Sequence, residues 1–598
     1  MNNWFELTNL ELSVLDTDLR GAAAARLGLK PEEIRSVRIL RRSIDARQHQ
    51  NVRFQYQLAV ETPEGFRPPA AANAQSFADE SDALQEQIEA IRRRLEGAKM
   101  APGRMPVESG RDAHAPVSTG RRPQAAELRP VIVGAGPAGL FAALAFTECG
   151  LRPVIVERGR PAEERAPDVE RFWGAGELDP ESNMYFGEGG AGTFSDGKLN
   201  TRSKNPAVTR ILRELAACGA PEEILYDAKP HIGTDRLVQL LPRLRQRLIA
   251  AGATFLFNTR LDDIRRTPGG ALEARLVSGA AAPRTAPSLA PPSHGHTAAP
   301  VSDTWIPANP LVVACGHSAF DTWRLLLRRG VPFAPKPTAI GCRMEHPAEF
   351  VTRHFFGKDQ QVLAVLGNAP YNLAVPVAAG AASAYSFCCC PGGEVVSCAA
   401  AAGLVSVNGM SYSRRDSPFT NAGLVTSVSP EEMVAAAPQH ATRNTQQEAQ
   451  IESIFAWREA LERRCFEMGG GAFGVPGQTA SDFAVGRATT RGLRTSSRRP
   501  VVPADFASLL PPQVAERLRE GLRAMDRKIP GWIRFGALLG VETTTSSPVR
   551  IVRTPQGGCE GWPELLPVGE GSGYAGGIVT SALDGHDTVL RWLSAPAG

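Results

Sequence analysis

The sequence predicts an α/β fold: a parallel sheet with its helices, interrupted by a large mixed α+β insertion and preceded by a small α+β module. Residues 131–157 run as strand, glycine-rich turn, helix and strand, which is the order of a parallel βαβ unit. A second glycine-rich turn near the end of the chain follows a strand and opens a helix over residues 578–593. About 250 residues lie between Gly316 and Gly569, enough for an inserted domain.

Composition and charge exclude several classes of protein. Of the 598 residues, 43% are hydrophobic and 21% are charged, which is ordinary for a globular chain. The formal net charge is only +4, so we expect no nucleic-acid partner, which would need a strong basic excess. The uncharged stretch 361–393 is interrupted by asparagines, prolines and glycines, which favours buried strands and turns over a membrane span.

The cysteines and the start of the chain indicate a cytoplasmic protein without a membrane partner. Ten cysteines do not make a disulfide framework in a chain of this length, and the adjacent trio at 388–390 suits reduced thiols. The first residues show no basic segment followed by an apolar run, so we expect no signal peptide.

The N-terminal segment favours a separate module. Period-2 alternation and an alanine-rich helix at 19–27 give the order β-α-β-β, and apolar spacings of three and four predict a helix at 81–98. Pro, Gly, Arg and Ala then indicate a linker. The boundaries that we expect are 1–98 for the module, 99–128 for the linker, 129–330 for the first part of the dinucleotide-binding domain with a low-complexity loop at 279–302, 331–560 for a substrate or cap domain, and 561–598 for the C-terminal part of the dinucleotide-binding domain.

The strongest motif is GAGPAG at residues 134–139, which fits the G-x-G-x-x-G pattern of a Rossmann-like unit. Gly134 permits the tight turn, Gly136 lets a pyrophosphate approach the backbone, and Gly139 lets the helix pack closely on the strand. Glu157 ends the second strand, 18 residues after Gly139, where a carboxylate accepts from adenosine ribose hydroxyls. A plain βαβ unit without a ligand is the alternative.

The same pattern occurs at 187–192 and 571–576, but neither copy has the whole strand-turn-helix-strand-acid context. We therefore expect the bound dinucleotide at residues 134–157.

Several segments together resemble the bacterial FAD-dependent dehydrogenase family. They are the unit at 131–157, the glycine-rich segment NMYFGEGGAGTFSDGKL at 183–199, and LPVGEGSGYAGGI at 566–578, with shorter likenesses at 43–47, 314–318 and 408–413. The resemblance covers nearly the whole chain apart from the two low-complexity stretches. It implies one FAD in a fold like that of the glutathione-reductase and p-hydroxybenzoate-hydroxylase flavoproteins.

The resemblance also implies which residues hold the FAD. An acid at the place of Glu570 binds a ribityl hydroxyl, and the helix that follows faces the flavin N1–O2 edge, where its N-terminus stabilises negative charge. Asp is usual there, and the alternative is that Glu570 only neighbours the helix N-cap. A small residue is needed at Gly316, beside the cofactor. The contacts that we expect are Gly134, Ala135, Gly136, Pro137, Ala138, Gly139, Glu157, Arg158, Gly190, Gly192, Thr193, Gly316, Gly569, Glu570, Gly573, Gly576, Gly577 and Ile578.

Lys198 is the candidate catalytic residue, because it follows a glycine-rich loop and could place a cation near the flavin or an anionic substrate. An exposed or ion-paired lysine is the alternative. We expect His317 to be a loop or supporting residue. We expect the neighbours Glu345 and His346 to be an ordinary surface pair, because adjacent strand residues point to opposite faces.

Cys388 and Cys390 suggest a redox dithiol, although buried reduced thiols are the favoured interpretation. On a regular strand their Cα atoms would be roughly 6.6–6.8 Å apart, at the upper edge for a disulfide. The Cys and His residues give no coherent metal-ligand set, so we expect no metal.

The function that these observations favour is an FAD-dependent oxidoreductase, a dehydrogenase that passes a hydride or two electrons between an unknown organic small-molecule substrate and FAD. No second complete dinucleotide unit follows, so any NAD(P)H donor or electron-transfer partner would bind transiently. One alternative is a flavin monooxygenase reduced by NAD(P)H. Another is a flavin-binding assembly or RNA-associated module without turnover, in which the N-terminal unit binds the partner.

Overall fold

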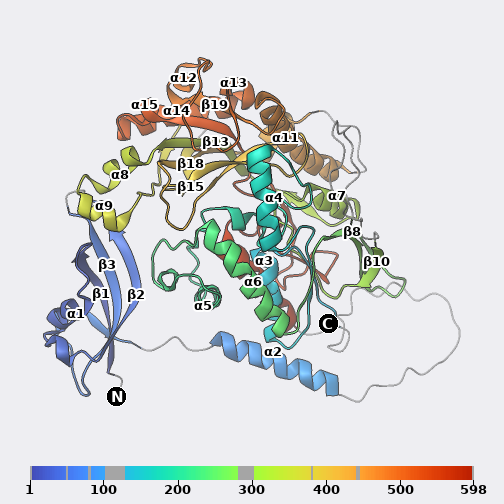
Figure 1. Ribbon diagram of the computed structural model, residues 1–598. Helices are drawn as coiled ribbons and strands as arrows, with labels where there is room; N and C mark the ends of the chain where they lie inside the picture. Colours follow the sequence, from blue (N-terminus) through green and yellow to red (C-terminus); the bar gives the residue numbers. More distant parts are fainter. Residues whose placement is uncertain are drawn as a thin grey trace.

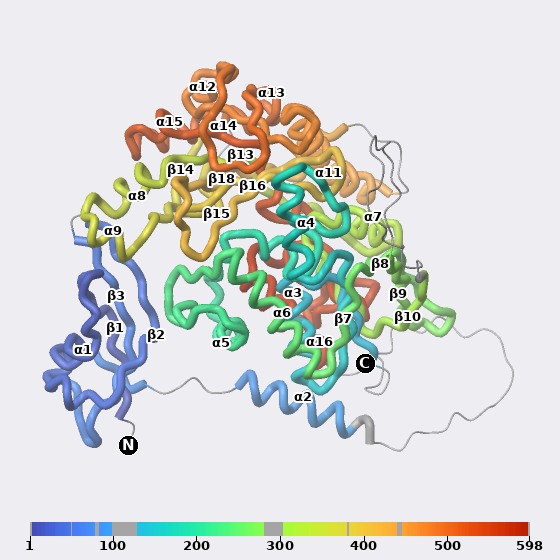
Figure 2. Tube along the Cα trace, in the orientation of Figure 1, coloured from blue at the N-terminus to red at the C-terminus, as the bar shows by residue number. Residues whose placement is uncertain are grey.

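The computed structural model describes residues 3–48, 51–77, 83–100, 128–279, 302–378, 382–438 and 445–595. The linker expected at 99–128 and the low-complexity loop expected at 279–302 lie outside these residues apart from their ends. Figures 1 and 2 show the described chain as a parallel-sheet unit below a larger mixed sheet, with the N-terminal module to one side.

The parallel sheet that the sequence predicts forms the centre of the first unit, and it has five strands. Its short strands are almost entirely apolar, as expected where both faces are covered. In spatial order they are β23 (Leu565–Pro567), β11 (Leu311–Val313), β5 (Val131–Val133), β6 (Val154–Val156) and β7 (Thr254–Leu256).

Alternate residues of these strands enter two different cores. Ile132, Ile155 and Val312 pack against helices, whereas Val131 and Val133 pack toward a three-stranded antiparallel sheet. The helices of the first core are α2 (Ala83–Met100), α3 (Pro137–Glu148), α5 (Ala207–Ala217), α6 (Thr234–Ala250) and α16 (Ile578–Ser594). The antiparallel sheet consists of β8 (Thr259–Arg266), β9 (Leu272–Ser278) and β10 (Ser302–Pro307).

The helices α3 and α16 come from opposite ends of the unit in sequence and cross closely. A Cβ at Gly585 of α16 would lie 2.1 Å from the carbonyl oxygen of Ala138 in α3, so only glycine permits this approach. The crossing places the N-terminal ends of both helices beside one cavity.

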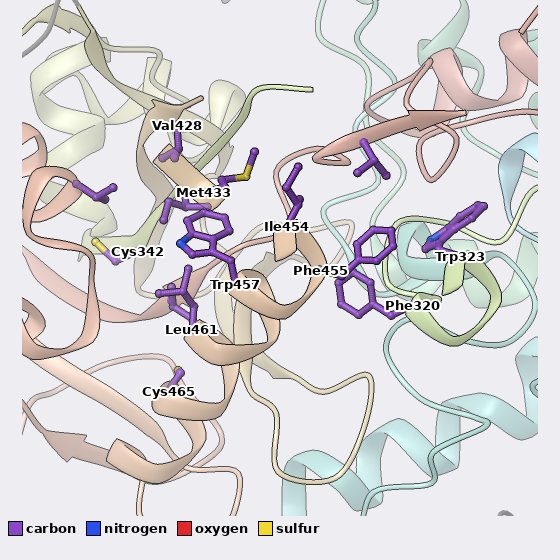
Figure 3. Packing of buried hydrophobic residues seen from close by; sticks show 14 of the residues in the cluster. Phe320, Trp323, Cys342, Val428, Met433, Ile454, Phe455, Trp457, Leu461 and Cys465 are labelled. Atoms are coloured by element: carbon purple, nitrogen blue, oxygen red, sulfur yellow. The ribbon is translucent and has the colours of Figure 1, made fainter. Parts of the chain in front are cut away.

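The inserted domain is built on a mixed seven-stranded sheet covered by long helices. Figure 3 shows one part of its core, where Phe455 and Trp457 of α11 (Gln446–Met468) lie between Trp323 and Val428. The strands, in spatial order, are β14 (Ala374–Pro376), β15 (Ser383–Cys390), β18 (Phe419–Val428), β13 (Thr338–Pro347), β21 (Ala537–Glu542), β19 (Val475–Thr479) and β20 (Val501–Pro503).

Shorter elements complete the two units. Two-stranded sheets pair β12 (Phe333–Pro335) with β22 (Val549–Ile551) and β16 (Glu394–Cys398) with β17 (Ser406–Met410). The remaining α-helices of the described chain outside the N-terminal module are α4 (Ala162–Ala175), α7 (Phe320–Arg328), α8 (Ala348–Phe356), α9 (Gln360–Leu366), α10 (Pro430–Ala435), α12 (Ala480–Val485), α13 (Phe506–Leu509), α14 (Pro512–Lys528) and α15 (Trp532–Phe535).

The N-terminal module has the predicted β-α-β-β order, with a short fourth strand added. Its sheet runs β2 (Ser36–Asp45), β3 (Arg53–Glu61), β1 (Trp4–Ser13) and β4 (Ala74–Ser76), and α1 (Leu19–Leu27) packs on it. Arg42 of β2 donates to Asp227 at 2.7 and 3.0 Å and joins the module to the parallel-sheet unit. The helix α2, expected within this module, packs on α16 instead (Figure 2).

The sequence predicts that Glu345 and His346 lie on a strand and that they form a surface pair. The structure confirms the strand and contradicts the surface pair. Glu345 and His346 lie on the predicted strand, but they are not a surface pair, because their exposed fractions are 1% and 0%. Both faces of β13 are covered, which a two-residue pattern does not reveal.

Within the described ranges, none of the helices has both the length and the apolar composition that a membrane span needs.

Candidate functional site

A cavity of about 350 Å³ lies at the carboxyl ends of the parallel strands. This edge is where open α/β sheets bind their ligands. It is lined by the glycine turn before α3 and by Glu157, and also by Glu570 and the N-terminus of α16. The inserted domain contributes Cys388 to the wall between the two units.

The glycine turn has the geometry that its sequence predicts. Gly134 has a φ of +106°, and a Cβ there would lie 2.5 Å from the carbonyl oxygen of Ala314. At Gly139 a Cβ would lie 1.9 Å from the carbonyl oxygen of Gly134, so the helix rests directly on the turn. A Cβ at Gly136 would instead lie no closer than 3.8 Å to another segment, the Gly190 backbone, and Gly136 lines the cavity. The first amides of α3 have no intrahelical acceptor, which makes this end suited to an anion.

Glu157 holds the glycine-rich segments together. Its carboxylate accepts hydrogen bonds from the amides of Ala135 at 2.8 Å, Gly159 at 2.9 Å and Gly187 at 2.9 Å. The side chain is almost fully buried and also lines the cavity. Because each carboxylate oxygen accepts about two hydrogen bonds, Glu157 retains acceptor capacity for a ligand hydroxyl.

Glu570 lies near His317, with 3.6 Å between Oε1 and Nε2. Burial raises the pKa of Glu570 to about 8. Burial, with the nearby Arg458 guanidinium, lowers the pKa of His317 to about 3. The two groups are therefore mostly uncharged at pH 7, and they line the cavity beside the N-terminus of α16.

Two positioning residues here were missed by sequence reasoning. Asp584 of α16 accepts from the amide of Gly569 at 2.8 Å and pairs with Arg553. Arg165 of α4 is fully buried and donates to the carbonyl oxygens of Asn183 at 2.8 Å and Glu188 at 2.7 Å, which fixes the glycine-rich loop. No motif contains either residue, because each acts on a segment distant from it in sequence.

Lys198 extends from the glycine-rich loop to the inserted domain. Its Nζ lies 3.7 Å from the Asp196 carboxylate, 3.8 Å from Cys388 Sγ and 4.0 Å from Cys390 Sγ, and it donates to the Cys389 carbonyl. Burial opposes the charge on Lys198, but the thiols and Asp196 outweigh it and raise the lysine pKa. The ammonium is therefore ion-paired at the cavity wall rather than exposed.

Arg343 of β13 is a further residue that the sequence reasoning passed over. It is fully buried, donates to Glu542 at 2.6 Å and to the Cys388 carbonyl at 2.8 Å, and reaches Asn408 at 2.8 Å. An arginine inside a strand as apolar as β13 was the signal that could have identified it, because charged side chains are seldom fully buried unless paired.

The structure brings most of the predicted residues to this one cavity. Four do not line it: Ala135 donates to Glu157, Gly139 packs on the turn, Thr193 is buried within the glycine-rich loop, and Gly573 lies against Val549. The predicted residues that line it are Gly134, Gly136, Pro137, Ala138, Glu157, Arg158, Gly190, Gly192, Lys198, Gly316, Gly569, Glu570, Gly576, Gly577 and Ile578.

These residues fit an FAD molecule. An elongated dinucleotide needs an anion site for its pyrophosphate and an acceptor for its ribose, and the part of the lining formed by Gly136 and Glu157 offers both. A second helix N-terminus suits the flavin, whose reduced form carries negative charge. The fit rests on the open cradle at Gly136, where the backbone itself forms the wall.

Comparison with known families agrees with this arrangement. Residues 129–166 match the FAD binding domain, and residues 337–545 match the FAD-dependent protein C-terminal domain-like family. Residues 7–61 match a domain of unknown function. An uncharacterised protein from Clostridium beijerinckii is 34% identical over 593 residues, which cover 97% of this chain and 96% of that protein.

Solved flavoproteins show weak overall likeness. A flavoprotein/dehydrogenase from Cytophaga hutchinsonii is 10% identical, with 78% of this chain and 79% of that one covered and a TM-score of 0.32. The FAD complex of CtdE is 10% identical, with 78% and 84% covered and a TM-score of 0.28. A geranylgeranyl bacteriochlorophyll reductase-like protein from Thermoplasma acidophilum is 10% identical, with 77% of each chain covered and a TM-score of 0.30.

The family resemblance expected from the motifs is confirmed by the near full-length relative together with the two matched domains. The five-stranded parallel sheet is that of the Rossmann-type flavoprotein fold. The chain therefore belongs to a family of FAD-dependent proteins that combine an FAD-binding domain with the C-terminal domain matched at residues 337–545.

Proposed function

We propose that this protein is an FAD-dependent oxidoreductase that passes a hydride or two electrons between an organic small-molecule substrate and FAD. The observation that carries the proposal is the single cavity lined by the N-terminal ends of both α3 and α16. FAD supplies the two-electron chemistry when it is bound, and the protein supplies orientation and electrostatics.

The chain's own groups have separate tasks along this cavity. The amides at the start of α3 bind the pyrophosphate, and Glu157 accepts from the adenosine ribose while it holds the glycine turn. The N-terminus of α16 stabilises negative charge at the flavin end. Glu570, with its raised pKa, donates a hydrogen bond to the ribityl chain as a neutral carboxyl at pH 7.

The substrate is expected between the two units, where residues of the inserted domain line the cavity. Phe387 and Asn408 provide apolar and polar contacts there. Lys198 places a cation in the same region, although Asp196 balances it. This combination supports a substrate that combines an apolar part with an anionic or polar group.

The test is a spectrum followed by a substrate screen. Purified protein should show the absorption bands of oxidised flavin, and heat should release FAD rather than FMN, which lacks the adenosine half that the α3 turn would hold. Candidate reductants are then added without oxygen, and bleaching of the flavin identifies a donor. Colourless protein that cannot be reconstituted with FAD contradicts the proposal, as does flavin that no reductant or reduced nicotinamide can bleach.

A further inference from the structure

Two thiols of one strand face one ammonium group at the wall of the cavity. Cys388 and Cys390 would lie on the same face of a regular β15 and point in parallel, but the strand is irregular between Phe387 and Cys390. Cys388 has a φ of +46°, in the left-handed region that non-glycine residues seldom adopt. This distortion directs both sulfur atoms toward Lys198, at 3.8 and 4.0 Å from its Nζ.

The surroundings of the pair favour one thiolate. Arg343 donates to the Cys388 carbonyl at 2.8 Å and adds a second positive charge. A hydrogen bond from the Cys390 thiol, together with Lys198 and Arg343, lowers the pKa of Cys388, whereas the pKa of Cys390 is raised. The titratable and charged groups around the pair are Lys198 and Asp196 from the glycine-rich loop, Arg343 from β13, Glu542 from β21 and Glu570 from the C-terminal turn.

The two sulfur atoms differ in access. Cys388 is partly exposed and lines the cavity, whereas Cys390 is fully buried behind it. Cys389 has a different environment: its sulfur accepts from the Tyr371 amide at 3.4 Å, and burial raises its pKa. Cys388 therefore has the position of an attacking thiolate and Cys390 that of a resolving thiol.

We propose that Cys388 and Cys390 form a redox-active dithiol whose oxidant is a low-molecular-weight disulfide, with Lys198 as the positioning cation. The Cys388 thiolate attacks one sulfur of the external disulfide, forms a mixed disulfide and releases the first thiol. Cys390 then loses its proton and attacks Cys388 Sγ, which forms the Cys388–Cys390 bond and releases the second thiol. The external disulfide gains two electrons from the two cysteines and two protons, of which one equals that lost by Cys390 and the other comes from water, because Cys388 reacts as the thiolate.

Return to the dithiol state needs two electrons and two protons. Their source is the two-electron carrier of the same cavity, so this part of the inference rests on the proposed function. The disulfide chemistry itself requires only residues of this chain and the external disulfide.

Oxidation of full-length, FAD-loaded protein by oxidised glutathione tests the proposal. The reduced protein is exposed to the disulfide, quenched in acid, alkylated and digested, and residues 388–390 are analysed by mass spectrometry. We expect Cys388 and Cys390 to become linked while Cys389 remains open to alkylation. Three alkylated cysteines, or a bond that includes Cys389, would overturn the proposal.

Serine variants separate the two roles. Cys390→Ser should leave glutathione trapped on Cys388, and Cys388→Ser should remain unmodified at both positions. Cys389→Ser is the matched control and should form the same Cys388–Cys390 bond as the wild type. A trapped adduct on residue 390 instead of Cys388 would reverse the assigned order and overturn the inference.

The role of Lys198 is tested by the rate at which iodoacetamide alkylates Cys388 in the reduced protein at pH 7. Lys198→Met should slow alkylation, about tenfold for each unit by which the thiol pKa then lies above 7. Lys198→Arg retains the charge and should restore most of the rate, which a purely structural role would not require. An equal rate in all three proteins would contradict the assignment.

Flavin content, measured in the same samples, separates this inference from the proposed function. Yellow protein that forms no disulfide overturns the dithiol and leaves the oxidoreductase proposal intact. Colourless protein that forms the Cys388–Cys390 bond supports the dithiol and contradicts the oxidoreductase proposal.

Discussion

Arg343 Nε lies 2.6 Å from Oε2 of Glu542, and the exposed fractions of the two side chains are 0% and 1%. The pair joins the neighbouring strands β13 and β21 at the wall of the cavity. An ion pair so deeply buried contributes little net free energy when intact, because desolvation offsets the attraction. Removal of one partner is costly, because the other polar group stays buried without its partner.

Arg343→Met should therefore destabilise the protein by about 3–5 kcal/mol. The matched control is Arg353→Ala, which removes the exposed i,i+4 pair with Glu349 in α8 and should cost less than about 1 kcal/mol. Urea denaturation gives both free energies of unfolding. Similar small losses in the two variants would mean that water reaches the Arg343 pair.

Glu157→Ala should weaken FAD binding by about 1.5–3 kcal/mol, which corresponds to a roughly tenfold to hundredfold rise in Kd. The variant loses the acceptor for the ribose and leaves the amides of Ala135 and Gly187 without their partner. Fluorescence titration of the apoprotein measures the affinity. Glu163→Ala removes an exposed carboxylate of the same unit and should bind FAD like the wild type. Equal affinity in the Glu157 and Glu163 variants would contradict the role of Glu157.

Glu345 should make stability depend on pH. Burial raises its pKa from 4.5 to about 7, although Ser496 donates to the carboxyl through its amide at 2.9 Å and through its hydroxyl. The folded state thus binds a proton that the unfolded state has released above pH 4.5. The resulting stabilisation is complete below that pH and is lost as the pH rises through 7.

Glu345→Gln removes the carboxyl group that titrates but keeps the shape of the side chain. Between pH 4.5 and 8 the unfolding free energy of the wild type should fall, relative to the variant, by a few kcal/mol. Urea denaturation over that pH range measures the difference. Parallel profiles for the two proteins would show that Glu345 titrates alike in the folded and unfolded states.

Short sequence patterns predicted those parts of the site that are formed by residues close together in the sequence. Three-residue apolar runs predicted the strands β5 and β6. The glycines predicted the turn before the helix α3, and the structure shows that a Cβ at Gly134 or Gly139 would clash with the backbone. The same reasoning identified the start of α16, because a glycine turn before an amphipathic segment is a local signal.

Contacts between distant segments could not be predicted in this way. Arg343 and Glu542 are about 200 residues apart, and neither belongs to a motif. Glu345 and His346 were expected at the surface because alternation assigns two faces to a strand but does not state what covers each face. Likewise, no sequence pattern predicts the positive φ of Cys388.

Glu570 supplies the last prediction, which concerns the midpoint potential of the bound flavin. Reduced flavin is anionic near N1, so a nearby carboxylate disfavours reduction and its removal should raise the potential. The pKa of Glu570 is about 8, so at pH 7 the carboxyl is mostly neutral and its removal relieves little repulsion. We therefore expect Glu570→Gln and the wild type to have nearly the same potential at pH 7. Above pH 8 the wild-type carboxyl ionises, and the variant should become the more oxidising of the two.

Spectroelectrochemical titration at pH 7 and pH 9 measures this divergence, with Glu560→Gln, which changes an exposed carboxylate ten residues earlier in the chain, as the control. The control and the wild type should have the same flavin potential at both pH values, because solvent screens the charge of an exposed carboxylate. A full difference already present at pH 7 would mean that Glu570 is ionised there, in spite of its burial. No difference at either pH would place Glu570 away from the flavin, and the assignment of the α16 end of the cavity to the isoalloxazine ring would then be wrong.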